Sequence, residues 1–329
     1  MPRGPVTRSL LAALPLLALL AAGCAPGDGP PAPETRDWSA HPAVVESGPV
    51  DVLYALSDVH GGYDRAIALL AGNGVIEPAL ASPAEARWTA GQATLVVIGD
   101  LFDKGPQGLE VIDLFRALQA SAEGAGGHVI VLMGNHEAEF LADPENKQAS
   151  RADGIDQEIR EQGLRPYDVA SRADPRGRFL RDLPFAARVG DWFFLHSGDS
   201  RGRTIAELSG TIRAAIDGQG YGSLEIVGPD SFLESIGWFR ASASIGQTYA
   251  GVLGVQHIVF GHDPGGIGDS KKHIGVDADA VLFRIDCGLS PNIDYSDGKL
   301  LRVRRESGME IAESLTPDAI AVVLHSGPI

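Results

Sequence analysis

Five short apolar runs, each as long as a buried strand, are followed directly by residues that can bind metal ions. The runs end at Leu56, Ile98, Met133, Leu195 and Phe260. The residues just after them are Asp58 and His60, then Asp100, then Asn135 with His136, then His196, and finally His262. In open α/β sheets, ligands gather beyond the carboxyl ends of the strands. This repeated succession predicts one shared metal site at the strand ends.

Hydrophobic periodicity predicts the fold class. The apolar runs cover residues 50–56, 94–98, 129–133, 192–195, 257–260 and 281–285, and helical spacing of apolar residues covers 63–70, 109–119 and 205–216. Buried strands that alternate with helices are typical of an α/β domain whose helices cover the sheet faces. Residues 138–187 are polar and helical in pattern, and we interpret them as an insertion beside the site.

The ligand types fit a centre of two metal ions. Two cations held close together repel each other, so a carboxylate must bridge them, and imidazoles and an amide oxygen can complete the shells. Such a centre lowers the pKa of a water and clamps phosphoryl oxygens during displacement at phosphorus. Mixed nitrogen and oxygen ligands suit Mn, Fe or Zn without selecting one of them.

The N-terminus is typical of an exported protein. Arg3 and Arg8 precede an apolar run at 10–22, too short for a membrane-spanning helix, and the run ends before Cys24 in a box that resembles a bacterial lipoprotein cleavage site. We predict a lipoprotein-type signal peptide at 1–23 and a membrane anchor through lipid on Cys24. Cleavage near Ala22 with plain secretion is the alternative. Both place the protein outside the cytoplasm, in the periplasm or on the outer membrane for the anchored form.

Composition bounds the rest of the chain. Residues 24–49 contain six prolines and three glycines without hydrophobic periodicity, which predicts a flexible tether, so the catalytic domain is expected at 50–329. The net charge of −16 argues against nucleic acid as a partner, since phosphate backbones bind basic surfaces. The second cysteine, Cys287, lies in an apolar stretch and is expected to be a buried thiol.

Taken together, the motifs resemble the calcineurin-like metallophosphoesterase superfamily, and its phosphoprotein-phosphatase-like bacterial branch in particular. They are Asp-x-His-Gly, Gly-Asp-x-x-Asp-Lys-Gly, Gly-Asn-His-Glu, His and Gly-His, and the resemblance extends from residue 50 to about 303. It implies a four-layer α/β/β/α sandwich of two mixed sheets. It also implies that one metal is held by Asp58, His60 and Asp100, and that Asp100 bridges to a second held by Asn135, His196 and His262.

The resemblance also implies roles for four further residues. A bridging hydroxide would attack phosphorus, and His136 would act as the general acid that protonates the leaving alkoxide, oriented by Asp103. Lys104, at a position where the family usually has Arg, and Arg240 would bind the substrate phosphate. Glu137 is expected to support the ligands by hydrogen bonding. The acidic residues Asp153, Asp156, Glu158 and Glu161 are most simply a solvated helix face.

One departure from the family's pattern favours a monoester phosphatase. Many phosphodiesterase members carry Gly-His-x-His, but this chain has Gly261-His262-Asp263-Pro264 and lacks the second His. The predicted substrate is a phosphoprotein or a small phosphomonoester. A phosphodiesterase, a dinucleoside-polyphosphate hydrolase or a lipid-diphosphate hydrolase is the enzymatic alternative, and a non-catalytic binding lipoprotein is the other. The sequence does not choose among phospho-Ser, phospho-Thr, phospho-Tyr and small metabolites.

Overall fold

The computed structural model describes Met1, Gly4 and residues 36–78, 80, 82–268, 270–293 and 295–329. The described elements all lie in one compact unit, Pro33–Ile329. Apart from Met1 and Gly4, the predicted signal peptide and Cys24 lie outside the described residues, so their processing stays a prediction. None of the helices in the described ranges has the length and hydropathy needed to cross a bilayer.

Two six-stranded mixed sheets form the centre of the described domain. Sheet A has the order β1 (Val44–Ser47), β5 (Ala186–Val189), β6 (Trp192–Leu195), β7 (His257–Phe260), β9 (Leu282–Arg284), β8 (Gly275–Val276). Sheet B has the order β12 (Ala321–Pro328), β11 (Met309–Leu315), β10 (Leu300–Glu306), β2 (Val52–Leu56), β3 (Thr94–Val97), β4 (His128–Val131). Parallel pairing joins β2 to β3 to β4 and β6 to β7 to β9, so these strands end on a common side.

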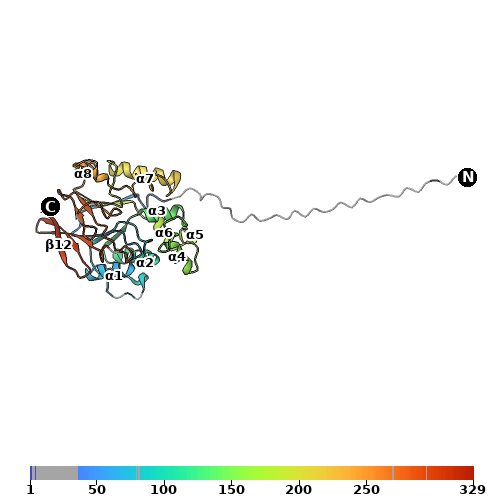
Figure 1. Ribbon diagram of the computed structural model, residues 1–329, viewed down its shortest axis with the longest axis horizontal. Helices are drawn as coiled ribbons and strands as arrows, with labels where there is room; N and C mark the ends of the chain where they lie inside the picture. Colours follow the sequence, from blue (N-terminus) through green and yellow to red (C-terminus); the bar gives the residue numbers. More distant parts are fainter. Residues whose placement is uncertain (2–3, 5–35, 79, 81, 269, 294) are drawn as a thin grey trace. The chain divides into compact units, whose positions relative to one another are not determined.

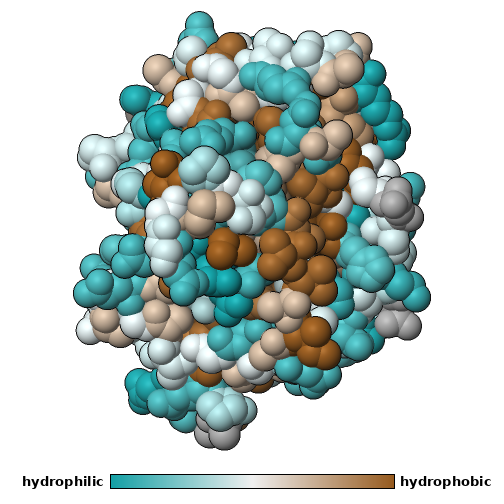
Figure 2. All heavy atoms as spheres, turned by 90° about the vertical axis from the view of Figure 1, so that its left-hand side faces the viewer, coloured by the Kyte–Doolittle hydropathy of each residue, from teal (hydrophilic) through white to brown (hydrophobic). Residues whose placement is uncertain are grey.

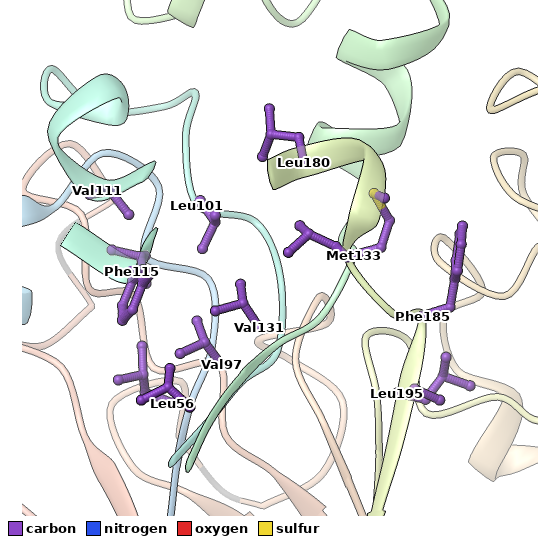
Figure 3. Packing of buried hydrophobic residues seen from close by; sticks show 14 of the residues in the cluster. Leu56, Val97, Leu101, Val111, Phe115, Val131, Met133, Leu180, Phe185 and Leu195 are labelled. Carbon is purple, nitrogen blue, oxygen red and sulfur yellow. The ribbon is translucent and has the colours of Figure 1, made fainter. Parts of the chain in front are cut away.

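The central strands are apolar throughout because both of their faces are buried. In β2, Leu53 and Ala55 point into the core between the sheets, whereas Tyr54 and Leu56 belong to the core beneath the helices. Figure 3 shows this second core, in which Leu56 lies close to Phe115 of α2 (Gly108–Gly124). Burying one such side chain contributes about 1.5–3 kcal/mol.

Helices cover the outer face of each sheet. In Figure 1, α1 (Tyr63–Gly72) and α2 lie on one side of the domain, and α7 (Ile205–Gln219) and α8 (Ile245–Leu253) lie on the other. The helix α2 packs on β4, while α7 contacts β1 and α8 contacts β7. The predicted α/β/β/α sandwich of two mixed sheets is therefore confirmed.

The predicted insertion holds short helices beside α2. They are α4 (Ile155–Glu161), α5 (Pro166–Val169) and α6 (Pro175–Asp182), and they follow α3 (Asn135–Ala142). The last residues of the predicted range belong to strand β5, since Ala186 and Ala187 are fully buried between β1 and β6. In Figure 1 the helices α4, α5 and α6 gather at one end of the domain.

The prediction of a tether over 24–49 is wrong for residues 36–49. Strand β1 pairs in parallel with β5, and Arg36 is buried with its guanidinium donating to the carbonyls of His41, Arg181, Asp182 and Leu183 at 2.9–3.0 Å. The proline-rich composition concealed a four-residue strand and an arginine, three of whose partners lie 145 or more residues further along the chain. The catalytic domain therefore includes the residues from Arg36 onward and does not begin at residue 50.

The edge of sheet B that is formed by β12 is open to solvent. Its edge strand β12 exposes Val322 and Val323, each to 58%. Figure 2 shows this side of the domain, where apolar atoms form a band between polar ones. No charged residue occurs between Ala321 and Ile329. This strand therefore lacks the lysines that often protect sheet edges.

Candidate metal centre and active site

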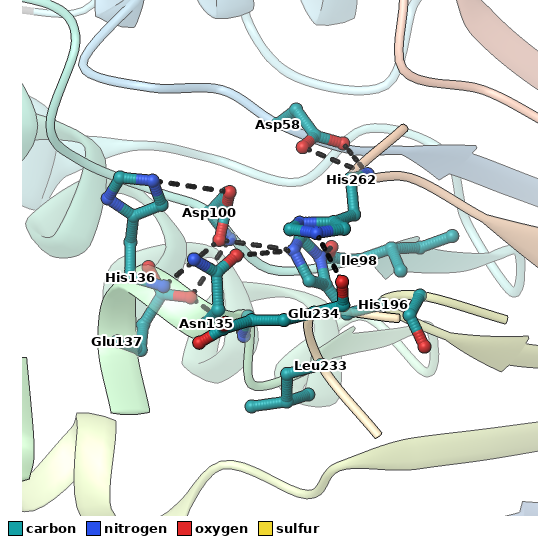
Figure 4. Close-up of polar contacts among 12 residues, drawn as sticks. Asp58, Ile98, Asp100, Asn135, His136, Glu137, His196, Leu233, Glu234 and His262 are labelled. Carbon is teal, nitrogen blue, oxygen red and sulfur yellow. Dashed lines mark hydrogen bonds and ion pairs between the residues drawn. The ribbon is translucent and has the colours of Figure 1, made fainter. Parts of the chain in front are cut away.

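The predicted metal ligands come from both sheets and meet at the strand ends. Asp58 and His60 follow β2, Asp100 follows β3, and Asn135 begins α3 after β4, so four ligands come from sheet B. His196 follows β6 and His262 follows β7 in sheet A. Figure 4 shows five of the six grouped together with His136. The predicted grouping of side chains is thus present.

The carboxylate of Asp100 lies at the centre of the group. Its Oδ1 is 3.2 Å from His196 Nε2, and its Oδ2 is 3.5 Å from His60 Nε2. Two sets of side chains have ligand atoms close enough to share a cation, namely His60 with Asp100 and His136, and Asp100 with His196 and His262. Asp100 belongs to both sets. Its two oxygens are therefore placed to bridge two ions.

Backbone contacts orient the imidazoles. His60 Nδ1 lies 3.1 Å from Phe102 O and His196 Nδ1 lies 2.7 Å from Ile98 O, so each ring donates from Nδ1 and turns Nε2 toward Asp100. His262 is arranged in reverse, with Nε2 at 3.2 Å from Glu234 O, which leaves Nδ1 for a metal. Such hydrogen bonds on the far ring nitrogen are typical of metal-binding histidines.

The second carboxylate, Asp58, is held against strand β7. Both of its oxygens accept from the backbone N–H of His262 at 3.1 Å. A Cβ on Gly261 would lie 2.1 Å from Asp58 Oδ2, so glycine is required there to make room for the carboxylate. Asp58 and Asp100 are each 1% exposed. Two buried carboxylates beside imidazoles are costly unless cations neutralise them, which fits a binuclear divalent-metal site.

Backbone conformation gives a separate sign of function. Six of the proposed site residues have positive φ, a conformation that non-glycine residues rarely adopt: Asp58 (53°), His60 (46°), Asp100 (53°), Asp103 (61°), Lys104 (58°) and His262 (60°). Each costs of order 1–3 kcal/mol and persists only where the surrounding structure enforces it. Such outliers cluster at active sites, and here they cluster on the predicted ligands and their neighbours.

The charges of the group are strongly coupled. Burial opposes the ionisation of Asp100, but His196 and His136 outweigh it and hold the pKa of Asp100 well below its usual value. Burial likewise disfavours the charged form of His196, yet Asp100 raises the pKa of His196 to about 10. Burial and the nearby His196 lower the pKa of His262 to about 3. Without a cation, His196 therefore carries the positive charge of this half of the site.

His136 and Asp103 form a buried pair next to Asp100. His136 Nδ1 lies 2.7 Å from Asp103 Oδ2, and His136 Nε2 lies 3.8 Å from Asp100 Oδ2. Burial disfavours the imidazolium, but Asp100 and Asp103 together raise the pKa of His136. The same geometry places His136 within reach of a cation shared with His60.

Glu137 fixes the loops that carry the ligands. Its Oε2 accepts from the backbone N–H of Asp100 at 2.9 Å and of Gly134 at 2.8 Å, and its Oε1 accepts from that of Leu101 at 2.8 Å. The carboxylate of one helical residue therefore joins the ends of β3 and β4. This is the supporting role predicted from the sequence.

The two predicted phosphate-binding residues differ in placement. Lys104 Nζ lies 3.1 Å from His60 Nε2, so its ammonium reaches into the site. Arg240 is exposed at the end of the short helix η2 (Trp238–Arg240), stacks over Phe239, and donates to Gly265 O and Gly266 O at 3.4 Å. It thus rests on the loop after His262, and no contact with the other site residues is seen among the described residues.

The sequence interpretation missed Glu158. It is not part of a solvated face, because its carboxylate accepts from the backbone N–H groups of Gly108 and Leu109 at 2.8 and 2.9 Å. The contact spans 50 residues, and no local motif marks it.

The comparison with known families agrees with this geometry. Residues 52–266 match the family model described as calcineurin-like phosphoesterase. The chain belongs to this family. The phosphoesterase is accordingly an enzyme of the metallophosphoesterase class.

Relatives of the phosphoesterase match it over different lengths. "Shewanella-like protein phosphatase 2" of Arabidopsis thaliana is 25% identical over 80% of this chain and 77% of its own. "Uncharacterized protein C1840.07c" of Schizosaccharomyces pombe is 44% identical, over 26% of this chain and 25% of its own. A symmetrical bis(5'-nucleosyl)-tetraphosphatase of Cronobacter sakazakii is 36% identical over 27% and 24%. For the latter two, the phosphoesterase therefore spans only about a quarter of the relative's length.

Among solved structures, the phosphoesterase is similar to a cold-active protein-tyrosine phosphatase of a psychrophilic Shewanella species. The TM-score is 0.68 at 24% identity, over 86% of this chain and 82% of that one. The similarity extends across the sandwich and shows that the two proteins share this fold.

Proposed function

We propose that the phosphoesterase hydrolyses phosphate monoesters with His136 as the general acid. The observation that carries this proposal is the buried pair of His136 and Asp103 beside Asp100 (2.7 Å from Nδ1 to Oδ2). The name of the Arabidopsis relative, a protein phosphatase matched over 80% of this chain, supports the same reaction class. Substrates would be phosphoproteins or small phosphomonoesters.

The proposed metal ligands are Asp58, His60, Asp100, Asn135, His196 and His262. Two bound divalent ions, Mn, Fe or Zn, would activate water and neutralise the phosphoryl charge. The donor set fits this role, because Asp100 bears one oxygen toward each half of the site.

The chain's own contribution to bond cleavage is a proton. Because Asp103 accepts the hydrogen bond from His136 Nδ1–H, the second proton of the imidazolium sits on Nε2, which faces the interior of the site. Both aspartates raise the pKa of His136 against the effect of burial and so favour its protonated form. In this position Nε2–H can protonate the oxygen of a departing alkoxide, which would otherwise leave as a strong base.

Lys104 supplies positive charge for the phosphate. Its ammonium contacts His60 Nε2, the atom assigned to a metal, and one lone pair cannot serve both. With His60 holding a metal, the Lys104 ammonium would be available to a phosphoryl oxygen. Lys offers a point charge there, without the two-pronged hydrogen bonding of Arg.

The segment after His262 favours monoesters over diesters. Asp263 Oδ1 accepts from the backbone N–H of Gly265 at 3.2 Å, so its carboxylate closes its own turn, and Pro264 stands where a phosphodiesterase has a second His. The local identity to a bis(5'-nucleosyl)-tetraphosphatase makes that substrate the alternative to test.

The decisive test is an assay of the full chain, stripped with a chelator and reloaded with Mn, Fe or Zn in turn. Nitrophenyl phosphate, an alkyl phosphate, bis(nitrophenyl) phosphate and diadenosine tetraphosphate should be compared. We expect hydrolysis of both monoesters and little of the diester. A preference for the diester or the tetraphosphate would replace the proposed function, and inactivity with every metal would favour a binding role.

A further inference from the structure

The insertion and the loop at residues 103–108 each cap a helix that the other begins. Glu158 of the insertion caps α2, and Asp103 of the loop caps α4. The carboxylate of Glu158 in α4 accepts from Gly108 N at 2.8 Å and Leu109 N at 2.9 Å, the first two residues of α2. In return, Asp103 Oδ1 accepts from Ile155 N at 2.8 Å, the first residue of α4. Each contact satisfies N–H groups that lack a partner within their own helix.

Asp103 is the link between this exchange and the proposed acid. Its Oδ1 bonds to the start of α4, while its Oδ2 bonds to His136 Nδ1 at 2.7 Å. The orientation of the Asp103 carboxylate, and hence of the imidazole, is therefore tied to the position of α4.

The loop between Asp103 and α2 depends on outside contacts for its shape. Asp103 and Lys104 both have positive φ. Gly105 N donates to Asp153 O at 3.3 Å, and Ser290 Oγ donates to Lys104 O at 2.7 Å. Glu158 anchors the far end of the loop through both of its carboxylate oxygens. A backbone in a costly conformation relaxes when such anchors are removed.

The charge at this contact is also suited to the role. Burial and the neighbouring Glu110 carboxyl raise the pKa of Glu158 to about 8. The N–H groups of Gly108 and Leu109, at the positive end of the 17-residue helix α2, oppose this shift and favour the carboxylate form of Glu158.

We propose that Glu158 is a positioning residue for the reaction, which holds the 103–108 loop so that Asp103 aligns His136 for proton donation. The inference rests on the proposed phosphatase function and deepens it. It gives the inserted helix α4 a role in catalysis through contacts alone, without a group that touches the substrate.

The test compares Glu158→Ala and Glu158→Gln with Glu161→Ala in the metal-loaded full chain. Glu161 is the matched control, an exposed glutamate on the same helix whose carboxylate contacts only Gln157 among the described residues. We expect Glu158→Ala to lower kcat/KM for an alkyl phosphate by about 10- to 100-fold, since misplaced acids lose rates of that order. The loss for nitrophenyl phosphate, whose leaving group needs no proton, should stay within about 3-fold.

Further readouts separate positioning from general damage. Metal content should be unchanged in all three variants, and the Ile155 amide should exchange hydrogen faster in Glu158→Ala than in Glu161→Ala. Glu158→Gln keeps one carbonyl acceptor, so it should show the same substrate bias at a smaller size, and it serves if the Ala variant does not fold. Equal losses on both substrates, or wild-type rates in Glu158→Ala, would overturn the proposal.

Failure of the proposed function would be recognised separately. If the wild type hydrolyses neither monoester with any metal, the phosphatase assignment falls. The Ile155 amide then still decides the structural claim. Faster exchange in Glu158→Ala alone supports a Glu158 anchor, and unchanged exchange refutes it.

Discussion

His196 Nε2 lies 3.2 Å from Asp100 Oδ1, and this contact joins the end of a strand in sheet A to the end of a strand in sheet B. The imidazole is charged because of this carboxylate. A cation bound between the two residues would take over the same electrostatic role. The candidate ligands thus come from both sheets, four from sheet B and two from sheet A.

The central carboxylate should control metal content. Asp100→Asn removes the charge shared by both halves of the site, so we expect loss of most bound metal and nearly all activity. Asp263→Asn is the matched control, because Asp263 only closes its own turn, and it should keep both metals. Elemental analysis together with a phosphatase assay checks the pair. A fully metallated, active Asp100→Asn would refute the bridge.

Metal affinity should rise with pH. The pKa of His196 is about 10 without metal, so a cation must displace a proton from it at neutral pH, whereas His262, with a pKa of about 3, is already neutral. Below pH 10 we therefore expect roughly tenfold tighter binding per pH unit for the one proton released. Titration calorimetry at pH 6.5, 7.5 and 8.5, in buffers of different ionisation enthalpy, measures both the metal affinity and the number of protons released. Affinity that does not vary with pH would contradict this account.

Gly261 should be intolerant of a single methyl group. The new Cβ in Gly261→Ala would lie 2.1 Å from Asp58 Oδ2 and would displace that carboxylate. Overpacking of this kind costs about 1–3 kcal/mol, and metal affinity should fall as well. The matched variant Gly251→Ala lies in α8 with open space at its Cβ, and should be stabilised by about 0.5–1 kcal/mol. Thermal unfolding and metal binding of both variants give the comparison.

His136 should be separable from the ligands. We expect His136→Gln to keep two metals and to lose about 10² to 10⁴ in rate on an alkyl phosphate, but less on nitrophenyl phosphate. Asp103→Asn should show the same bias more weakly, since it removes only the partner of Nδ1. The measurement is kcat/KM on both substrates alongside metal content. Loss of a metal from His136→Gln would identify His136 as a ligand. Its imidazole lies close enough to His60 and Asp100 to share a cation with them.

The lipid anchor can be tested by fractionation. We propose that Cys24 is lipidated, so Cys24→Ser should move the protein from the membrane to the soluble extracytoplasmic fraction. Acyl chains contribute about 0.8 kcal/mol per buried methylene, so the shift should be large. A wild type already soluble after lysis would favour plain secretion instead.

The sequence predicted the parallel strands, and the grouping of the candidate ligand residues at their ends, because both follow from local signals. Buried parallel strands are continuous apolar runs, so the predicted runs at 192–195 and 257–260 coincide with β6 and β7. Because parallel strands run in the same direction, the residues that follow them lie at the same edge of the sheet. The ligand motifs themselves occupy only a few consecutive residues each.

Contacts between segments that are distant in the sequence could not be predicted from such local signals. The antiparallel strands β10 and β11 carry charged residues, among them Arg302 and Arg304, which pair with Glu313 across the sheet, so no apolar run marks these two strands. Strand β1 gains its place only by pairing with β5, about 140 residues later in the chain. The Glu158 anchor likewise depends on a fold in which α4 and α2 are neighbours, and its charge alone suggested solvent.

If Cys24 is lipidated as proposed, the hydrogen bonds of Arg36 limit how far the enzyme can reach from the membrane. Because Arg36 is hydrogen-bonded to the carbonyls of residues 181–183, only the residues before it can form the linker to a membrane anchor. Only twelve residues separate Arg36 from the start of the proposed mature chain, counting from Cys24 to Thr35. Even fully extended they span no more than about 40 Å. With the proposed lipid on Cys24, the enzyme would therefore reach only phosphoesters presented close to the bilayer surface.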